Sequence, residues 1–226
     1  MRGIVYHCGA CPYLPAREFH AFHPVPNPPE DIPYRILMDH RFRRSGSHLY
    51  LPVCPGCDSC QPIRVDIAAF NPREDQRRCL RRNHDLTVTW HERGLDAERA
   101  DLYRRYQAVI HGKPTDEDGG TFLTEDGGIG GGELHARDAA GRLLAVSVLD
   151  RFDDALSSVY CYYEPDQPHR GLGTFMALSE IDYCRQNHMT WLYLGFLVRG
   201  CAKMEYKARY LPHEVLEKGE WVRYGS

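Results

Sequence analysis

The sequence lacks any apolar run that approaches the roughly 20 residues of a membrane-spanning helix. Its first residues, MRGIVYHCGACPYLP, contain no uninterrupted apolar stretch of the kind that a secretory signal requires. We therefore expect neither a membrane partner nor export, and the expected location is the cytoplasm.

An excess of positive charge is also missing, because 28 Lys and Arg residues stand against 31 Asp and Glu residues, for a net charge of −3. A chain without a global basic field is a poor candidate for a protein that coats nucleic acid, although local basic patches remain compatible with it. We therefore do not expect DNA as a partner.

Cysteine, in contrast, is abundant, with nine residues in 226. In a reducing compartment, so many thiols indicate metal ligation, or buried thiols that act as small apolar groups. The segment Cys54-Pro-Gly-Cys57-Asp-Ser-Cys60 repeats the Cys-x-x-Cys spacing of metal sites, and a tetrahedral site needs a fourth ligand. We predict a zinc ion or an iron–sulfur cluster on Cys8, Cys11, Cys54, Cys57 and Cys60, with unligated reduced thiols as the alternative.

The first half of the chain alternates between proline-rich and periodic segments. Residues 1–35 predict a cysteine-bearing hook and an extended linker, because HPVPNPPEDIP cannot form a helix interior. A short helix, a turn at Ser45-Gly46 and strands are expected up to residue 67, followed by a basic helix over 72–84. A strand and a helix ending at Gly112 come next, and the Gly-, Asp- and Thr-rich segment 113–133 predicts a loop.

From about residue 133, the pattern predicts three strands, a helix, a buried strand and a helix ending before Pro212. This order favours an α+β fold with a mixed sheet and packed helices. We expect an N-terminal cysteine-bearing domain at residues 1–70. A C-terminal domain at residues 71–226, of the acyltransferase type with an N-acetyltransferase-like (GNAT-like) sheet, completes the predicted organisation.

A glycine-containing turn, His169-Arg170-Gly171-Leu172-Gly173-Thr174, is expected between a strand and a helix that begins near Thr174. Glycines let the backbone approach a ligand, and the N–H groups of a first helical turn attract phosphate. Proteins of the N-acetyltransferase fold hold coenzyme A at such a turn, although Pro168 stands where their pattern has Gln or Arg. The alternative is an ordinary strand-to-helix turn.

Arginines form two clusters. Between residues 73 and 82 they recur at three- to four-residue steps, so several share one face of a helix. Arg77, Arg78, Arg81 and Arg82 are candidates for binding a tRNA backbone, with a solvated surface face as the alternative. In the other cluster, Arg43 or Arg44 is able to bind a carboxylate through two parallel hydrogen bonds.

The order of these motifs resembles the arginyl-tRNA–protein transferase family, and within it the bacterial aspartate/glutamate leucyltransferases. The similarity extends over nearly the whole chain. Its segments are Cys11-Pro-Tyr-Leu-Pro, Phe42-Arg-Arg-Ser-Gly, Tyr50-x-Pro-x-Cys54-x-x-Cys57-x-Ser-Cys60-Gln-Pro-Ile-Arg64-Val, Asp101-Leu-Tyr-x-Arg-Tyr106, Leu172-Gly-Thr, Trp191-Leu-Tyr-Leu-Gly195-Phe and Cys201-x-x-Met204-x-Tyr206-Lys207.

This resemblance implies an aminoacyltransferase that conjugates leucine from Leu-tRNA to the N-terminal Asp or Glu of proteins and so marks them for degradation under the N-end rule. An arginyl donor is the alternative, since Cys8 adds a Cys-x-x-Cys that is typical of the arginyl branch. A coenzyme A-dependent N-acetyltransferase is another alternative. A zinc-ribbon adaptor for nucleic acid is a further one, but it would leave the C-terminal half unexplained. The expected partners are Leu-tRNA and proteins with N-terminal Asp or Glu.

Aminoacyl transfer to an amine requires alignment of the reactants, stabilisation of an oxyanion and a proton acceptor, but no cofactor. We expect the tRNA 3′ end at the glycine turn and the acyl group beside Tyr193 and Gly195. Lys207 and Tyr206 are the candidate catalytic residues, although Tyr206 also suits a core position. The predicted substrate-binding residues are Arg43, Arg44, Tyr50, Gly171, Gly173, Thr174, Tyr193, Gly195 and Lys203.

Overall fold

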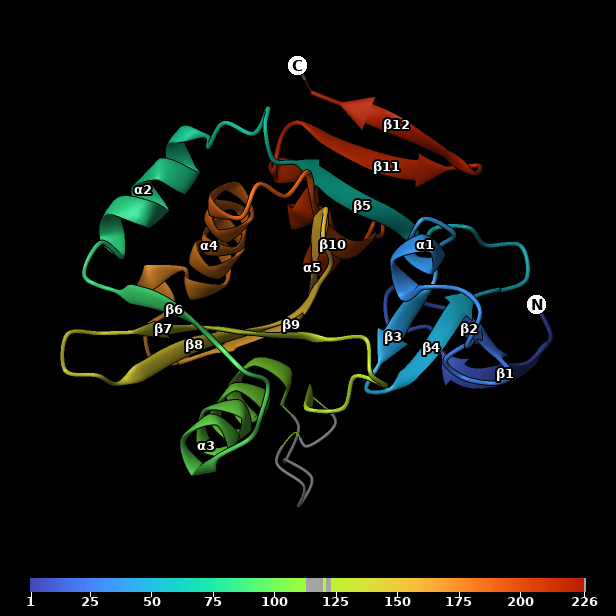
Figure 1. The fold of residues 1–226 in the computed structure, drawn as a ribbon, viewed down its shortest axis with the longest axis horizontal. Helices are drawn as coiled ribbons and strands as arrows, with labels where there is room; N and C mark the ends of the chain where they lie inside the picture. The colour runs from blue at the N-terminus through green and yellow to red at the C-terminus, as the bar shows by residue number, and fades with distance from the viewer. Residues whose placement is uncertain (113–119, 121–122, 226) are drawn as a thin grey trace. The chain divides into compact units, whose positions relative to one another are not determined.

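The computed structural model describes residues 1–112, 120 and 123–225, and these divide into two compact units (Figure 1). Unit 1 contains Met1–Phe70, Asp126–Ile129 and Tyr193–Ser226, whereas unit 2 contains Asn71–Glu125 and Gly130–Leu192. Both units are discontinuous in sequence. A division into domains at 1–70 and 71–226 therefore remains a prediction.

Unit 1 begins with a four-stranded sheet in the order β1-β2-β4-β3. Its strands are β1 (Gly3–Ala10), β2 (Glu18–Pro24), β3 (Arg43–Ser45) and β4 (His48–Pro52), and each neighbouring pair is antiparallel. The helix α1 (Tyr34–Met38) precedes β3. The expected N-terminal hook is wrong, because β1 and β2 pair as a hairpin; the proline-rich stretch 25–33 has neither helix nor strand, as expected.

The second part of unit 1 contains strands in the order β12-β11-β5-β10. These are β5 (Gln61–Asp66), β10 (Trp191–Leu197, in unit 1 from Tyr193), β11 (His213–Glu217) and β12 (Glu220–Tyr224). The pair β11–β12 was not predicted. The helix expected before Pro212 consists of two short pieces, α5 (Ala202–Glu205) and the 3-10 helix η4 (Tyr206–Arg209).

Unit 2 has an antiparallel meander in the order β9-β8-β7-β6, formed by β6 (Thr87–His91), β7 (Gly131–Arg137), β8 (Leu143–Arg151) and β9 (Ala155–Tyr163). The helices α3 (Ala97–Tyr106, continued by the π-helix Gln107–His111) and α4 (Leu172–Gln186) cover opposite faces of these strands (Figure 1). Beneath α3 lies a buried core of Leu102, Tyr103, Tyr106, Val146, Val148 and Tyr162. The third helix, α2 (Glu74–Arg82), packs against α4.

The predicted α+β class is confirmed, and most predicted helices and strands are present. The helix expected near Thr174 begins two residues earlier, because Gly171 adopts a left-handed φ of +65° and caps α4 directly. Of the predicted loop 113–133, residues 113–119 and 121–122 lie outside the described residues, and Gly131 already belongs to β7. Within the described ranges, no helix is both long and apolar enough to span a bilayer.

Candidate active site

Arg43 is a buried cation that no carboxylate accompanies. Strand β3 directs its side chain inward, where it is 6% exposed. Its guanidinium donates to the carbonyl oxygens of Phe42 (2.8 Å), Gly195 (3.1 Å) and Met38 (3.4 Å). Over the described part of the chain, no carboxylate oxygen lies within 4.0 Å of it, and its Nε has no partner. Burial lowers the pKa of Arg43, and the more distant carboxylate of Asp39 opposes this shift only in part.

Lys207 is another buried cation of unit 1. It lies in η4, where Nζ donates to the carbonyl oxygen of Phe196 at 2.8 Å and contacts the sulfur of Met204 at 3.7 Å. Burial, and secondarily the charge of Arg43, lowers the pKa of Lys207 to about 7. A substantial fraction of this amine is therefore neutral, and able to accept a proton, near neutral pH.

Gly195 lies close to both Arg43 and Lys207. Its φ of +78° lies in the left-handed region, which disfavours any residue with a Cβ. Its carbonyl accepts from Arg43, and a Cβ at this position would lie 3.7 Å from Nζ of Lys207. The turn of the chain inside β10 therefore places the Gly195 carbonyl against Arg43 and the side of Gly195 that lacks a side chain next to Lys207.

Tyr193, fully buried on β10, anchors a polar network beside Arg43. Its hydroxyl donates to Asp39 at 2.6 Å and accepts from Arg64 at 3.1 Å. Burial, followed by the hydrogen bond to Asp39, raises the pKa of Tyr193. Because the ring centroid lies 5.8 Å from the Arg43 guanidinium carbon, the fixed hydroxyl also fixes an aromatic face next to the cation.

Arg64 completes this network from β5. It donates to Glu214 at 2.7 Å, lies 3.5 Å from Asp39, and stacks over Trp221 at 4.0 Å. Sequence reasoning did not include Asp39, Arg64 or Glu214 among the site residues. The available signal was the position of Arg64 within the motif Gln-Pro-Ile-Arg-Val.

A cavity of about 320 Å³ in unit 1 is lined by residues that neighbour the two cations. Tyr50 and Phe196 both line it. Tyr50 is the cross-strand partner of Arg43, and the carbonyl of Phe196 is the acceptor for Lys207. Burial raises the pKa of Tyr50, and also that of Tyr13 in the same wall to about 12, so both hydroxyls remain protonated donors. The volume falls in the range of small-ligand sites.

The five cysteines predicted to bind a metal do not form a closed ligand set. Cys8 is exposed, whereas Cys60 is buried, and burial raises the pKa of its thiol to about 12. Cys11 accepts from the amide of Leu14 at 3.4 Å, and Cys57 donates to the Ser59 hydroxyl at 3.4 Å. Across the described residues, no three thiols approach within 4.8 Å of one another. The zinc or cluster site on these cysteines is therefore not confirmed, and no step of the chemistry is assigned to it.

The glycine turn lies in unit 2, at the N-terminus of α4. No side chain caps this helix end, and a Cβ on Gly173 would lie 3.2 Å from the ring of Tyr163. The carbonyls of the turn are held by α2: Asn83 donates to Arg170 at 2.9 Å, and Arg82 donates to His169. The structure thus brings the predicted phosphate turn and the predicted tRNA-binding helix together within one unit.

The arginines of α2 are exposed and share one carboxylate. Glu74 lies 3.1 Å from Arg77, 2.8 Å from Arg81 and 3.9 Å from Arg78, and the hydrogen bonds from Arg81 and Arg77 lower its pKa. The three arginine side chains are 45–63% exposed. They form an accessible basic surface whose charge is partly neutralised within the helix.

The remaining predicted residues of unit 1 differ in environment. Arg44 is buried and donates to the carbonyl of Gly46 at 2.8 Å, so it has a structural partner. Lys203 is exposed, and Tyr206 is 44% exposed, so the core alternative for Tyr206 is wrong. Gly171, Gly173 and Thr174 belong to unit 2, whereas Tyr193, Gly195 and Lys207 belong to unit 1.

Comparison with known proteins agrees with these observations. Residues 9–78 match the family described as "Arginine-tRNA-protein transferase, N terminus", and residues 98–217 match "Arginine-tRNA-protein transferase, C terminus". The chain is 40% identical over 219 residues to the aspartate/glutamate leucyltransferase of Pseudomonas putida (strain W619), covering 94% of this chain and 92% of that protein. It is also 40% identical over 218 residues to that of Teredinibacter turnerae, at 94% and 89% coverage. The chain therefore belongs to the arginine-tRNA-protein transferase family.

Solved structures with a similar fold are more distant in sequence. One is the C-terminal domain (DUF2156) of a putative lysylphosphatidylglycerol synthetase from Agrobacterium fabrum, with a TM-score of 0.53 and 15% identity over 73% of this chain. The alignment spans 58% of that protein's chain. A GCN5-related glucosamine N-acetyltransferase region of a fungal enzyme aligns with a TM-score of 0.44 and 13% identity, over 87% of this chain and 23% of that one. At 15% identity the first likeness concerns the fold alone, and no conclusion is drawn from the second.

Proposed function

We propose that this protein transfers leucine from Leu-tRNA to the N-terminal Asp or Glu of proteins, as a cytoplasmic aminoacyltransferase that marks them for degradation under the N-end rule. Relatives that are 40% identical over nearly the whole chain are named aspartate/glutamate leucyltransferases. The structural observation that carries the proposal is the buried pair Arg43 and Lys207 next to a cavity. Two neighbouring cations without a carboxylate between them form a site that an acidic substrate completes.

Arg43 is proposed to bind the acidic side chain of the acceptor. A guanidinium that is bonded only to neutral carbonyls gains a strong charge-assisted contact when a carboxylate arrives. Its unpartnered Nε is one donor available for that contact. Tyr50, whose hydroxyl stays protonated, is placed on the cavity wall to give a further hydrogen bond.

Lys207 is proposed to move the proton of the reaction. The neutral α-amine of the acceptor attacks the ester carbonyl carbon of Leu-tRNA, and a new C–N bond forms as the carbonyl becomes an oxyanion. Lys207 takes one proton from the attacking nitrogen, and the collapse of the oxyanion breaks the bond to the ribose oxygen. That oxygen leaves with the proton that Lys207 returns. Correctly matched acid–base groups contribute roughly 10²–10⁴-fold to rate.

The exposed residues next to Lys207 are assigned to the same step. Tyr206 precedes it in η4, and Lys203 lies in α5 immediately before. We assign the Tyr206 hydroxyl to the developing oxyanion and the Lys203 ammonium to the ester end of the donor. Electrostatic stabilisation of this kind often provides the largest single contribution in acyl transfer. Since the aminoacyl ester is already activated, no resident cofactor has a part in the scheme.

The nucleotide end of the donor is assigned to unit 2. The uncapped N-terminus of α4 offers backbone N–H groups and the positive end of the helix dipole to a phosphate. Arg82 lies against the same turn, and Arg77, Arg78 and Arg81 continue the basic surface along α2. The contact of Arg82 with this turn supports a shared role of α2 and the turn in holding the tRNA 3′ end.

The test is to incubate the protein with total charged tRNA and four reporter peptides that differ only in their first residue: Asp, Glu, Asn or Ala. Mass spectrometry of the products should show one added leucyl residue on the Asp and Glu peptides and none on the other two. An added arginyl residue would change the donor assignment. Acetylation in the presence of acetyl-coenzyme A, without any aminoacyl transfer, would overturn the proposal.

A further inference from the structure

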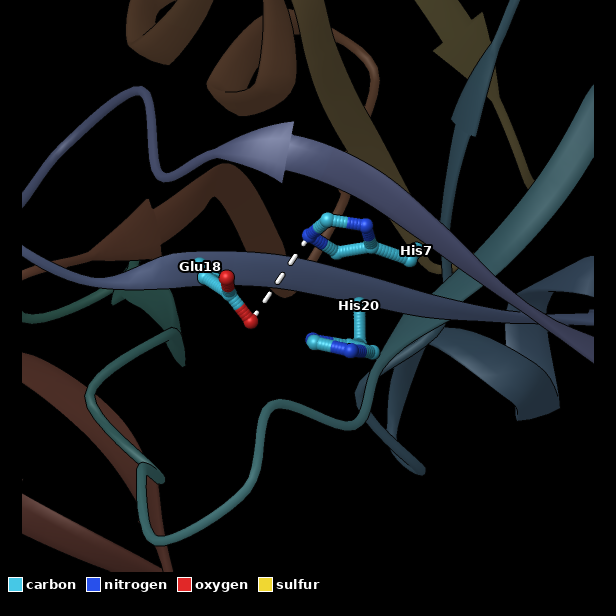
Figure 2. A group of neighbouring side chains, drawn as sticks. All are labelled: His7, Glu18 and His20. Carbon is cyan, nitrogen blue, oxygen red and sulfur yellow. Dashed lines mark ion pairs between the residues drawn. The ribbon is translucent and has the colours of Figure 1, made fainter.

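A cluster of metal-ligand side chains outside the proposed active site lies on the N-terminal hairpin of unit 1. His7 on β1 and His20 on β2 are direct cross-strand partners, so both side chains are on the same face of the hairpin. Glu18 lies two residues before His20 on the same strand and therefore shares that face. Figure 2 shows the three side chains turned toward one another from these two strands.

The three side chains are close enough to share one ion. His7 Nε2 lies 3.7 Å from Glu18 Oε2, and the centroids of the two imidazole rings are 4.8 Å apart. One ligand atom from each residue lies within 4.8 Å of the others. Zinc–ligand bonds of about 2.0–2.2 Å place the ligands of a tetrahedral site roughly 3.4 Å apart. A contraction of about 1 Å is feasible because the side chains of His7 and Glu18 are 55% and 69% exposed.

His20 supplies a second, independent observation. Its Nδ1 atom is buried and has no hydrogen-bond partner. Buried polar atoms nearly always have a partner, and an exception calls for an ion or a water molecule that satisfies it. A half-buried imidazole with an unused ring nitrogen, next to another imidazole and a carboxylate, has the donor chemistry of a metal ligand.

This set is separate from the cysteines. Cys8 follows His7 along β1 and lines the cavity on the opposite face of the hairpin, as do Phe19 and Ala21 of β2. The thiol of Cys54 lies close to His20, but it contacts the backbone, 3.4 Å from N and 3.7 Å from O. Two imidazoles and one carboxylate form a nitrogen–oxygen site, and this combination is known to bind Zn²⁺ with one position open.

We propose that His7, Glu18 and His20 bind one Zn²⁺ ion, which ties the edge strand β1 to β2. The bound ion also fixes the connection between these strands, residues 11–17, on which Pro12 and Tyr13 line the cavity. The edge strand is held mainly by its pairing with β2, and the metal adds a side-chain cross-link to that pairing.

The test is a titration of the metal-free full-length protein with CoCl₂, followed by displacement with ZnCl₂. We expect one Co²⁺ per chain with visible d–d bands but without the intense ultraviolet bands of cobalt–thiolate bonds. His7→Asn, Glu18→Gln and His20→Asn should each weaken Co²⁺ binding at least about tenfold. His84→Asn, which changes another exposed histidine, should bind Co²⁺ as the unchanged protein does.

A melting experiment guards against a folding defect in the variants. ZnCl₂ should raise the midpoint of thermal unfolding of the unchanged protein and of the His84 variant, and leave the His7 variant unaffected. Far-ultraviolet circular dichroism identifies any misfolded variant. If one ligand variant is misfolded, Co²⁺ binding by the other two ligand variants decides whether the proposal holds. Absence of binding, binding that survives in folded variants, or cobalt–thiolate bands that vanish with Cys54→Ser would each overturn the proposal. None of these measurements depends on transfer activity, so they are independent of the proposed function.

Discussion

Two buried cations of unit 1, Arg43 and Lys207, and the arginines of α2 in unit 2 occupy opposite environments. Arg43 and Lys207 are buried, and in the described residues no carboxylate pairs with either. The arginines of α2 are exposed, and three of them contact Glu74. Burial of uncompensated charge is unfavourable, whereas exposed ion pairs contribute little to stability. The buried cations of unit 1 lower stability, whereas the exposed arginines of unit 2 do not. A ligand that supplies negative charge is therefore expected in unit 1.

The largest expected effect follows from removing the buried amine. Lys207→Met should lower kcat/KM for leucyl transfer to an Asp peptide by roughly 10²–10⁴-fold, because the proton acceptor is lost. Its fold should persist, since an apolar side chain replaces a buried cation. Lys218→Met, an exposed lysine in the β11–β12 turn, is the matched control and should keep full activity. Steady-state kinetics with charged tRNA measures both, and full activity of Lys207→Met would remove the assignment.

The next effect concerns pH and stability. The pKa of Lys207 is about 7 in the folded protein and about 10.4 in an unfolded chain. Between these values the unfolded state binds the extra proton, so the free energy of unfolding rises with pH. Below pH 7 both states are protonated and the full cost of the buried charge is present. From pH 7 to 9 this group contributes a rise of roughly 2–3 kcal/mol, at about 1.36 kcal/mol per unit.

Urea unfolding at pH 7, 8 and 9 measures this slope against that of Lys207→Met. The difference between the two proteins isolates Lys207 from all other titrating groups. Equal slopes would mean that the amine is charged throughout, and it would then be unsuitable as a base at neutral pH.

Arg43→Lys tests whether the buried guanidinium recognises the acidic side chain. The charge is kept but the planar fork of donors is lost, so the preference for an Asp peptide over an Asn peptide should fall about tenfold. The KM for Leu-tRNA should stay constant, because this residue is not assigned to the donor. Kinetics with the two peptides at saturating Leu-tRNA gives the ratio. An unchanged ratio would place recognition of the carboxylate elsewhere.

The smallest effect is expected on α2. Replacing Arg77 and Arg81 together by Ala should raise the KM for Leu-tRNA a few-fold at moderate salt and flatten its salt dependence. Glu74→Gln should act in the opposite direction, because it releases the arginines from their shared carboxylate. Steady-state transfer kinetics over a range of NaCl concentrations compares the KM of the two variants. If both behave like the unchanged protein, α2 is only a solvated surface.

Local patterns predicted much of the fold, since helices such as α3 and α4 and strands such as β8 and β10 depend on nearby residues. The hairpin β1–β2 was missed because its outer strand is exposed along almost all its length and shows no core-facing pattern. The pair β11–β12 was missed as well. Short-range periodicity also contains no information on the pairing of β11 with β5, about 150 residues earlier.

The sequence by itself determined the family motifs, the helix end at Gly112, and the identity of Arg43, Lys207 and Gly195 as candidates. Only the tertiary structure decided which charges are buried. It brought Arg43 of β3 against the carbonyl of Gly195 and joined Asp39 to Tyr193, residues that are more than 150 positions apart. Charge and hydrogen-bonding capacity are properties of a residue type, but the solvent around a side chain and the pKa that follows from it depend on which distant segments pack against it.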